Sequence, residues 1–494
     1  MDQSFDPELI IGLVGAVGTE IKVVVELLEE RLRLAGYETE KIKISEQVIP
    51  LVPEACGAYD ASDAFQRIKA LMDGGNAVRR LANDNGVLAD GVATLIYDGR
   101  AKDKDGRSIP NVRKAYIVDS LKRPEEVGRL RSVYPNGFVL IGIHSEENQR
   151  LENLVNNLGI SPENAKTLIS RDGEEQKVPN GQRLNKTFHL ADFFVRLTGN
   201  RERLRHDIRR MIEIWFGYPY HTPTFDEYAM FMAFSAALRS ADLSRQVGAV
   251  IARNEMILAT GANDCPRFGG GLYWPAPDNQ GAIGDIDRGR DYKRESDSNR
   301  IEQLRMIEDI SSKFSELGVP AEKAKEILES SRLRDLTEFG RVVHAEMEAL
   351  LACGRLGIST VDSTLYSTTF PCHNCAKHIV AAGIKRVVYV EPYPKSKAID
   401  FHDDSISTST IPEAGKVQFQ PFVGIGPRRY FDLFSINGNN SYPLDRKDPM
   451  TGKSVKWAIE RAKLRIKMAP DSYLGFELQA TNKFSQFIKK GQPS

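Results

Sequence analysis

VHAE at residues 343–346 and PCHNC at residues 371–375 are the two stretches around which this chain is organised. The imidazole of His344 and the thiolates of Cys372 and Cys375 are nitrogen and sulfur donors of the kind that Zn²⁺ prefers. Three protein ligands leave one tetrahedral position to water, whose pKa the metal lowers toward neutrality. Glu346 stands two residues after the histidine and off its helical face, so we expect it to move protons rather than to bind the metal.

The pattern around these stretches predicts that the ligands lie at helix N-termini. Residues 341–353 have helical periodicity, residues 365–370 alternate as a strand, and Pro371 opens a second helix that ends near residue 382. Another strand is predicted over residues 385–391. The positive end of a helix dipole favours a thiolate, which a zinc ligand must be.

The order H-x-E, a gap and P-C-x-x-C is the signature of the zinc-dependent nucleobase deaminases. Taken alone, the C-x-x-C pair would also fit a structural zinc site or a redox pair. A structural site needs a fourth protein ligand, and Cys56, Cys265 and Cys353 are scattered along the chain. The combination therefore favours a catalytic zinc site.

Length and composition narrow the class of protein further. A chain of 494 residues is long for one core and suggests two domains. Lys and Arg number 67, as do Asp and Glu, and this zero formal charge disfavours a protein that holds long nucleic acid through its phosphates. The five cysteines do not make a disulfide framework, the acidic N-terminus lacks a signal pattern, and no apolar run approaches a membrane span. We expect a cytoplasmic protein.

A glycine-rich turn follows the first predicted strand. Residues 9–17 are apolar, IGLVGAVGTE occupies residues 11–20, and an amphipathic helix follows over residues 21–35. Strand, glycine turn and helix form a phosphate-binding arrangement. The candidate nucleotide-binding residues are Gly12, Gly15, Gly18, Thr19, Lys22 and Asp119.

This start resembles the small P-loop kinases of nucleotides, with one departure. In the register GxxxxGK[ST] from Gly12, Val17 takes the place of the second glycine, Gly18 takes the place of the lysine, and only Thr19 matches. Without that lysine we do not expect efficient phosphoryl transfer, although the backbone N–H groups of residues 15–19 can hold a phosphate and Lys22 could substitute.

The remainder of the N-terminal half has the rhythm of a parallel sheet covered on both faces. Short buried strands are predicted over residues 92–98, 115–119 and 137–143, and helices over residues 189–195 and 201–216. Two polar segments, 120–126 and 171–176, are placed to line a nucleotide cleft, or else are solvated loops.

The C-terminal half resembles the cytidine deaminase fold in its element order. A helix over residues 225–241 and a hairpin of residues 244–252 and 256–262 precede the zinc helices, and an insertion interrupts the resemblance between residues 266 and 341. The insertion has two helical segments, 298–317 and 320–339, which suit a lid, a regulatory surface or an oligomer contact. The tail after residue 415 is expected to finish this domain or cover its edge.

We therefore expect an α/β protein of two domains. Residues 1–217 would form a P-loop kinase-like three-layer αβα domain, and residues 218–494 a cytidine deaminase-like αβα zinc domain with a helical insertion at about residues 267–340. The deaminase half looks like the deoxycytidylate deaminases. That resemblance implies that Asn263 lies near the sugar and the Ala345 N–H near the base carbonyl, with Arg245, Arg267 and Lys397 as candidates for phosphate contact.

The full arrangement is similar to the bacterial antiphage dCTP deaminases. This resemblance implies conversion of dCTP and dCMP to uracil nucleotides, an activity that is normally restrained, and an N-terminal domain that serves as a sensor or structural partner. An inhibitory regulator and a nucleotide at the N-terminal domain are the candidate partners, and we expect that domain to bind a nucleotide weakly or not at all and to transfer no phosphate. Two alternatives stay open: a polynucleotide cytidine or adenosine deaminase, which shares the four motif residues, and a non-catalytic nucleotide sensor. We also expect a homo-oligomer, from the insertion helices and from the aromatics Tyr273, Trp274 and Tyr292; the alternative is a lid over the chain's own site.

Overall fold

The chain folds into two compact units, each built around a six-stranded sheet. The computed structural model describes residues 7–57, 59–174, 181–331, 333, 336, 338–393, 396–409, 411–438, 441–466 and 470–491. The first unit combines Met1–Glu227 with Phe422–Ser494, and the second is Tyr228–Pro421. The tail after residue 421 thus belongs to the first unit, whereas the sequence predicted that it completes the zinc domain.

The sheet of the first unit has the order β14-β5-β4-β1-β3-β2. Its parallel strands are β1 (Leu9–Gly15), β2 (Glu38–Lys43), β3 (Lys114–Asp119), β4 (Phe138–Ser145) and β5 (Phe193–Leu197), and β14 (Gly424–Ile425) pairs antiparallel with β5. All of β1 is buried, as expected for a parallel strand covered on both faces.

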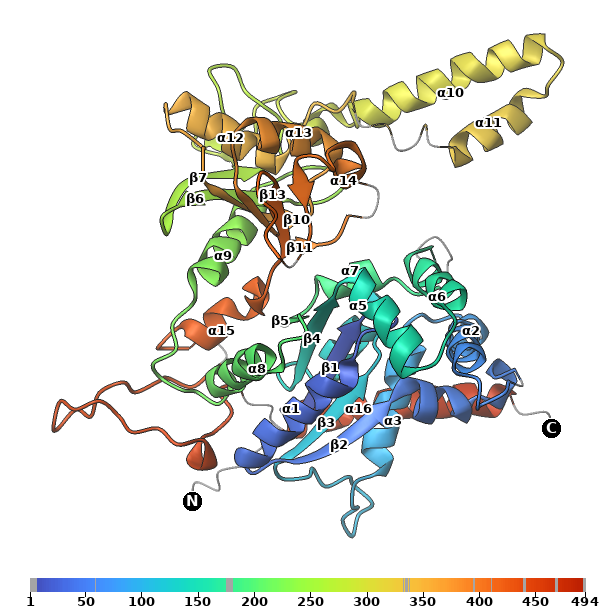
Figure 1. Ribbon diagram of the computed structural model, residues 1–494, viewed down its shortest axis with the longest axis vertical. Helices are drawn as coiled ribbons and strands as arrows, with labels where there is room; N and C mark the ends of the chain where they lie inside the picture. Colours follow the sequence, from blue (N-terminus) through green and yellow to red (C-terminus); the bar gives the residue numbers. More distant parts are fainter. Residues whose placement is uncertain are drawn as a thin grey trace. The chain divides into compact units, whose positions relative to one another are not determined.

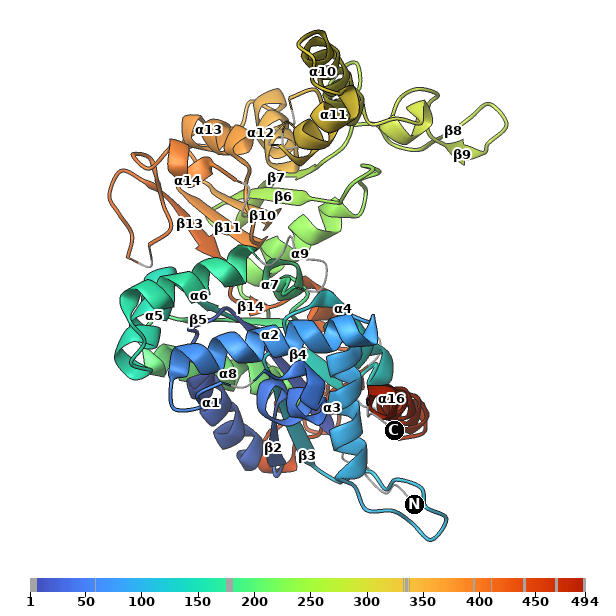
Figure 2. The ribbon, with the colours of Figure 1, turned by 90° about the vertical axis from the view of Figure 1, so that its right-hand side faces the viewer.

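Helices cover both faces of this sheet (Figures 1 and 2). Leu9, Ile11 and Leu13 share a core with α1 (Ile21–Leu34) and α8 (Arg201–Trp215). By the alternation of a strand, Ile10 and Gly12 point to the opposite face. The other helices of the unit are α2 (Ala64–Ala82), α3 (Val87–Asp98), α4 (Pro124–Val133), α5 (Glu147–Glu152), α6 (Pro162–Glu174), α7 (Leu184–Phe188), α15 (Tyr430–Phe434) and α16 (Pro470–Gly491).

Two predicted elements of this unit are wrong in type. Residues 92–98, expected as a strand, belong to helix α3, which is buried on nearly every side. A helix covered all round shows the same continuous apolar run as a buried strand, so periodicity does not separate the two. Residues 189–195, expected as a helix, contain the start of β5, which pairs in parallel with β4.

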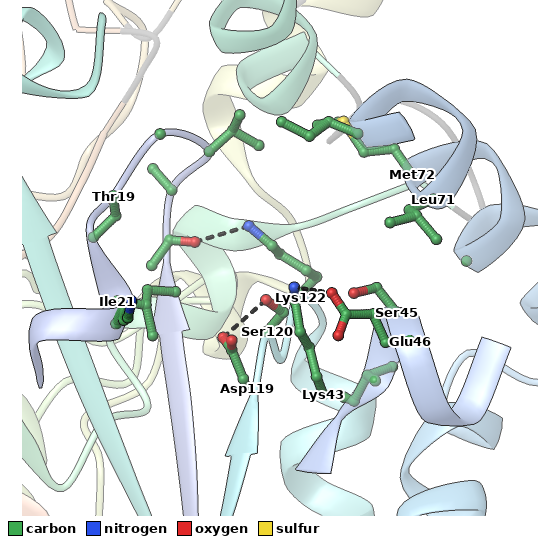
Figure 3. Close-up of a pocket in the computed structure, with 18 of the residues that line it drawn as sticks. Thr19, Ile21, Lys43, Ser45, Glu46, Leu71, Met72, Asp119, Ser120 and Lys122 are labelled. Atoms are coloured by element: carbon green, nitrogen blue, oxygen red, sulfur yellow. Dashed lines mark hydrogen bonds and ion pairs between the residues drawn. The ribbon is translucent and has the colours of Figure 1, made fainter. Parts of the chain in front are cut away.

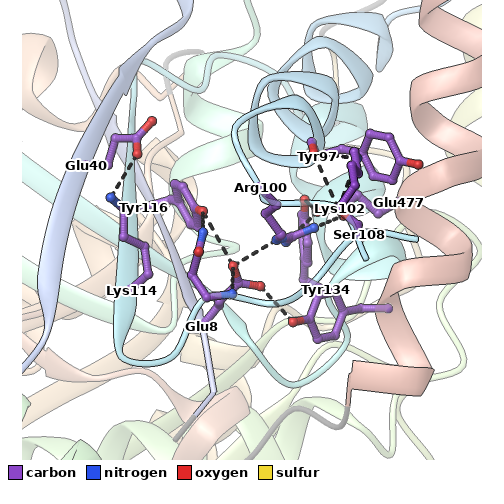
Figure 4. Close-up of polar contacts among 12 residues, drawn as sticks. Glu8, Glu40, Tyr97, Arg100, Lys102, Ser108, Lys114, Tyr116, Tyr134 and Glu477 are labelled. Atoms are coloured by element: carbon purple, nitrogen blue, oxygen red, sulfur yellow. Dashed lines mark hydrogen bonds and ion pairs between the residues drawn. The ribbon is translucent and has the colours of Figure 1, made fainter. Parts of the chain in front are cut away.

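A buried polar network explains why the tail belongs to the first unit (Figure 4). Arg100, just after α3, donates from Nε to Glu8 Oε1 at 2.8 Å and from Nη2 to Glu477 Oε1 of α16 at 2.9 Å. The hydroxyls of Tyr134 and Tyr473 donate to Glu477 and Glu8 at 2.5 and 2.7 Å. Helix α16 is thereby attached to α3 by charges as well as by apolar contacts.

The second unit has a mixed sheet of order β12-β13-β11-β10-β6-β7. Its strands are β6 (Gly248–Arg253), β7 (Met256–Ala262), β10 (Thr364–Thr369), β11 (Arg386–Glu391), β12 (Ile406–Ser407) and β13 (Val417–Pro421). The predicted hairpin is confirmed: β6 and β7 turn through Asn254 and Glu255, whose φ angles of 51° and 56° suit a two-residue hairpin turn.

Beyond its sheet, the second unit contains helices and an insertion between β7 and α12. Its helices are α9 (Phe225–Ala237), α12 (Ala345–Arg355), α13 (His373–Ala381) and α14 (Ala398–Phe401). The insertion contains a short hairpin of β8 (Ala276–Pro277) and β9 (Ile283–Gly284), then α10 (Ser298–Glu316) and α11 (Ala321–Ser330). None of the described helices of either unit has the length and hydropathy needed to cross a membrane.

Candidate active site

The zinc-ligand candidates lie at the N-termini of two helices of the second unit. His344 is the N-cap of α12, Cys372 is the N-cap of α13, and Cys375 lies in the first turn of α13. Helix α12 begins at Ala345, later than the sequence predicted, because Val343 forms a β-bridge with Asp264 through N···O contacts of 3.0 and 3.3 Å. The bridge holds the chain extended up to the histidine.

The three ligand atoms are spaced as one zinc ion requires. Nδ1 of His344 lies 3.3 Å from Sγ of Cys372 and 3.3 Å from Sγ of Cys375, and all three atoms lie within 4.8 Å of one another. Tetrahedral Zn–N and Zn–S bonds of about 2.0 and 2.3 Å separate such atoms by about 3.5 Å. The other three cysteines, all of them described, are outside this cluster. The residues present therefore fit a zinc site with three protein ligands.

The thiols and Glu346 are electrostatically coupled. A hydrogen bond from Cys375 lowers the pKa of Cys372 to about 3, which favours the thiolate form that a zinc ligand must have. The carboxyl of Glu346 is only 4% exposed. Its Oε2 lies 3.5 Å from Sγ of Cys375, and its Oε1 accepts from the Ser367 hydroxyl at 3.4 Å. Burial raises the pKa of Glu346, and the Cys372 thiolate raises it further. This carboxyl is beside the metal position and suited to exchanging protons.

A glycine that the sequence analysis did not single out as a packing residue seats α12 on the sheet. A Cβ at Gly261 of β7 would lie 2.1 Å from the Ala345 carbonyl oxygen and 2.6 Å from the Ala349 nitrogen. Helix α12 therefore rests directly on the β7 backbone. Gly248 of β6 has the same role toward α9, where a Cβ would lie 1.9 Å from the Ala233 oxygen.

Of the predicted substrate residues, Asn263, just after β7, contacts the loop before β6 that carries Arg245. Asn263 accepts from the Val247 N–H at 2.6 Å and donates to the Arg245 carbonyl at 2.8 Å, so its amide already has partners. The Arg245 guanidinium is exposed and lies 5.0 Å from the ring centroid of Tyr393. Ala345 is fully buried at the start of α12.

Arg267 and Lys397, the other phosphate candidates, have partners in their own segments. Arg267 donates from Nε to the Gly270 carbonyl at 3.2 Å, and Lys397 pairs with Asp400 at 2.7 Å. Arg267 thus has a neutral partner and Lys397 an anionic one, while the exposed Arg245 guanidinium lies near the Tyr393 ring, so both Arg245 and Arg267 stay candidates for phosphate contact.

The insertion is tied to the residues that flank His344. Arg290 is 4% exposed and lies 3.2 Å from Asp264 and 3.1 Å from Asp285. Arg341 donates to Asp291 at 2.6 Å. Because Asp264 also bridges to the residue before His344, the insertion and the zinc site share a support.

The three insertion aromatics differ in exposure. Trp274 is 56% exposed and carries the Arg239 guanidinium 3.6 Å above its ring, and Tyr292 is 40% exposed. Tyr273 is half-buried.

The N-terminal candidates lie in the first unit and line a cavity of about 560 Å³ there, with one exception. Gly15, Gly18, Thr19, Lys22 and Asp119 are in its lining. Gly12 is inside β1, where a Cβ would lie 2.6 Å from the Leu121 side chain and 2.8 Å from that of Phe138. Gly12 lies outside the lining of this cavity, and close packing inside β1 is a reason for a glycine at this position.

Comparison with known proteins assigns the zinc site. Residues 223–391 match the family model of the cytidine and deoxycytidylate deaminase zinc-binding region. The deoxycytidylate deaminase of enterobacteria phage T2 is 33% identical over 166 residues, which are 34% of this chain and 79% of the phage protein. That of Saccharomyces cerevisiae is 27% identical over 227 residues, 44% of this chain and about half (55%) of the yeast protein. The crystal structure of the cyanophage S-TIM5 dCMP deaminase aligns at 20% identity and a TM-score of 0.23, over 41% of this chain and 100% of that one. The chain thus belongs to the cytidine and deoxycytidylate deaminase family, with zinc as its cofactor.

Proposed function

We propose that this chain is a hydrolase that deaminates free deoxycytidine nucleotides, converting dCTP and dCMP to dUTP and dUMP and releasing ammonia. The observation that carries the proposal is the buried Glu346 carboxyl beside the cluster of His344, Cys372 and Cys375. The deoxycytidylate deaminases among its relatives support a cytosine nucleotide as substrate.

The chemistry needs a nucleophile and a proton carrier. Zinc on the three ligands supplies a Lewis acid that makes water nucleophilic near neutral pH. Glu346 takes a proton from that water and delivers protons to the cytosine ring and to the leaving amine, while water oxygen replaces nitrogen at C4. The raised pKa of Glu346 suits a group that must both accept and donate. The Ser367 hydroxyl orients its other oxygen.

For the substrate contacts we propose a division of labour. Arg245, exposed at the loop before β6, would bind the phosphates. Asn263 would hold this loop in place for the sugar, since both groups of its amide already bond the loop backbone. The Ala345 N–H, at the start of α12, would bind the base carbonyl.

We also propose that dCTP depletion by this protein, in the cytoplasm, defends against phage and is restrained by an inhibitory regulator. The support is the combination of the zinc unit with a first unit, Met1–Glu227 with Phe422–Ser494, whose start resembles a P-loop kinase lacking its lysine. In infected cells, the wild type should lower dCTP and phage yield, and Glu346→Gln should do neither. Equal protection by both would separate the defence from deamination.

Chromatography of purified protein incubated with dCTP, dCMP, CTP and a cytosine-containing oligonucleotide tests the activity. We expect uracil products from dCTP and dCMP. Product from the oligonucleotide alone would favour a polynucleotide deaminase, and no product from any substrate would favour a nucleotide sensor.

We further propose a homo-oligomer joined through the insertion. Phe268 and Ile283 of the insertion are fully and 79% exposed in the single chain, which supports a partner surface there. Light scattering at several concentrations should give a multiple of 55.2 kDa. A monomer mass at every concentration would contradict the assembly and favour a lid.

A further inference from the structure

The cavity of the first unit lies where its parallel strands end (Figure 3). It is bounded by the glycine turn after β1, the ends of β2 and β3, and one side of α2. Ligands of open α/β sheets bind in the crevice outside the carboxyl ends of the strands. A volume of about 560 Å³ lies in the range of pockets that hold small molecules and cofactors.

The lining of this cavity combines cations with an apolar wall, and three of the cations, Arg79, Lys41 and Lys43, are paired with Glu126, Asp119 and Glu46. Its six cations are Lys22, Lys41, Lys43, Arg67, Arg79 and Lys122, against the carboxylates Glu20, Glu46 and Asp119. The apolar wall is formed by Ile44, Ile49, Ile68, Leu71 and Met72. An anionic ligand with a flat apolar part matches this combination.

Lys122 brings a cation to the glycine turn, where the P-loop lysine is missing. It comes from the connection between β3 and α4, and its Nζ donates to the Gly15 carbonyl at 2.8 Å and lies 3.9 Å from Asp172. Ser120, two residues earlier, has a φ of 78°, which is uncommon for a residue other than glycine. Strained backbone of this kind is found at ligand sites, where the surrounding structure maintains it.

The glycine turn itself is largely closed to a phosphate chain. The Val17 N–H donates to the buried Asp172 carboxylate at 2.9 Å, so a protein anion already sits where a phosphate would. Arg150 and Asn153 donate to the Val17 and Gly18 carbonyls at 3.3 and 2.8 Å. A donor triphosphate would have to displace these contacts.

The Thr19 hydroxyl is the part of the turn that remains available. Its Oγ1 is buried and has no hydrogen-bond partner in the described structure, and Thr19 is one of the residues that line the cavity. An unsatisfied buried hydroxyl is costly, and a ligand oxygen would satisfy it.

We propose that this cavity binds one phosphorylated nucleoside and transfers no phosphate. Its phosphate contacts Lys122 and Lys43, and its base lies against Leu71 and Met72. Asp119 and Ser45 provide oxygens for the sugar hydroxyls on the same side of the cavity. This inference is independent of the deaminase activity, since it concerns only residues of the first unit.

Calorimetric titration of the full chain with dCMP, dTMP, dAMP, dGMP and inorganic phosphate tests the proposal. We expect at least one nucleotide to bind with a Kd below about 1 mM, as pockets with several charge-assisted contacts do. Lys122→Met and Lys43→Met should each weaken that binding by about 10- to 100-fold, the loss expected for a hydrogen bond to a charged group. Lys69→Met, an exposed residue of α2 outside the cavity lining, is the matched control and should bind as the wild type does.

Each other outcome overturns the proposal. If no nucleotide binds, the cavity is not a nucleotide site. If Lys122→Met, with its folding verified by circular dichroism, binds as tightly as the wild type, the nucleotide binds somewhere other than this cavity. Inorganic phosphate binding as tightly as the nucleotides would refute a role for the apolar wall. Transfer of radiolabel from ATP to any of these nucleotides would show a kinase. Comparing the wild type with Lys122→Met also distinguishes nucleotide bound in this cavity from dCMP bound at the zinc site, because Lys122 belongs to the first unit.

Discussion

Replacing Gly261 with alanine should disturb the zinc site although no atom of Gly261 binds the metal. The added methyl group would meet the Ala345 oxygen at 2.1 Å and the Ala349 nitrogen at 2.6 Å, and both are backbone atoms of α12. Neither can rotate away as a side chain would. Ordinary contact therefore requires β7 and α12 to separate by more than about 1 Å, because packed interiors have no spare volume.

That displacement is large compared with what a zinc site tolerates. Ligand distances must be right to within about 0.2 Å, and His344 lies one residue before α12 while Cys372 and Cys375 belong to α13. Overpacking alone costs about 1–3 kcal/mol of unfolding free energy. Loss of bound zinc adds to this, because the metal binds only the folded state. We expect Gly261→Ala to lose at least about 3 kcal/mol and most of its zinc.

Gly354→Ala is the matched control on the helix itself. A Cβ at Gly354 meets nothing within 4 Å, and alanine is the better helix former by about 1 kcal/mol. The urea midpoint should therefore fall in Gly261→Ala and stay equal or rise in Gly354→Ala. The zinc content, measured by atomic emission, should fall only in Gly261→Ala. A Gly261→Ala protein with full zinc and an unchanged urea midpoint would refute the close approach of β7 and α12.

Three further changes probe the site and its scaffold. Glu346→Gln should retain zinc but lower kcat by about 10²–10⁴-fold, because the amide cannot carry protons; steady-state kinetics beside a zinc assay would contradict this by showing near-native turnover. Arg100→Met should lower the unfolding free energy by about 3–5 kcal/mol, since two buried carboxylates lose their partner, and adding Glu477→Gln should recover part of the loss in urea unfolding. Burial lowers the pKa of His144 to about 3, so as the pH falls the unfolded chain, in which the pKa is about 6.5, takes up the proton first. The free energy of unfolding should therefore fall as the pH drops from about 6.5 toward 3, and it should fall less steeply in His144→Gln. Equal pH slopes in the two proteins would contradict the burial of a neutral His144.

The zinc cluster was predictable from the sequence because its chemistry is local. His344 and Glu346 share one helix start, and Cys372 and Cys375 share another, so spacing alone limits what they can do. The hairpin before them was predictable for the same reason. The role of Gly261 was not, because nothing in the order of residues shows that a Cβ at this position would come within 3 Å of the backbone of α12.

Elements held by distant partners were predicted poorly. The apolar run of α3 resembles a strand until α16, nearly 400 residues later, covers it. Glu477 likewise reads as a solvated charge on an amphipathic helix, yet it is fully buried because Arg100 and Tyr134 satisfy its oxygens. Charged residues are exposed on average, but a buried charge with partners is an exception. Glu477 is such a residue, and its contacts help to explain why the tail belongs to the first unit and not, as predicted, to the second.

The glycine turn shows how far a missing motif residue can be interpreted. The sequence has Gly18 where a P-loop lysine belongs, which argues against a standard phosphate-transfer site. It does not argue against a cation at that point, because Lys122 reaches the Gly15 carbonyl from the end of another strand. A parallel sheet brings the ends of its strands to one edge, so a charge absent from the first strand's turn can be supplied by the third. A missing motif residue thus shows only that the turn itself does not supply the cation. The charges that line the cavity come from several of the segments that meet there.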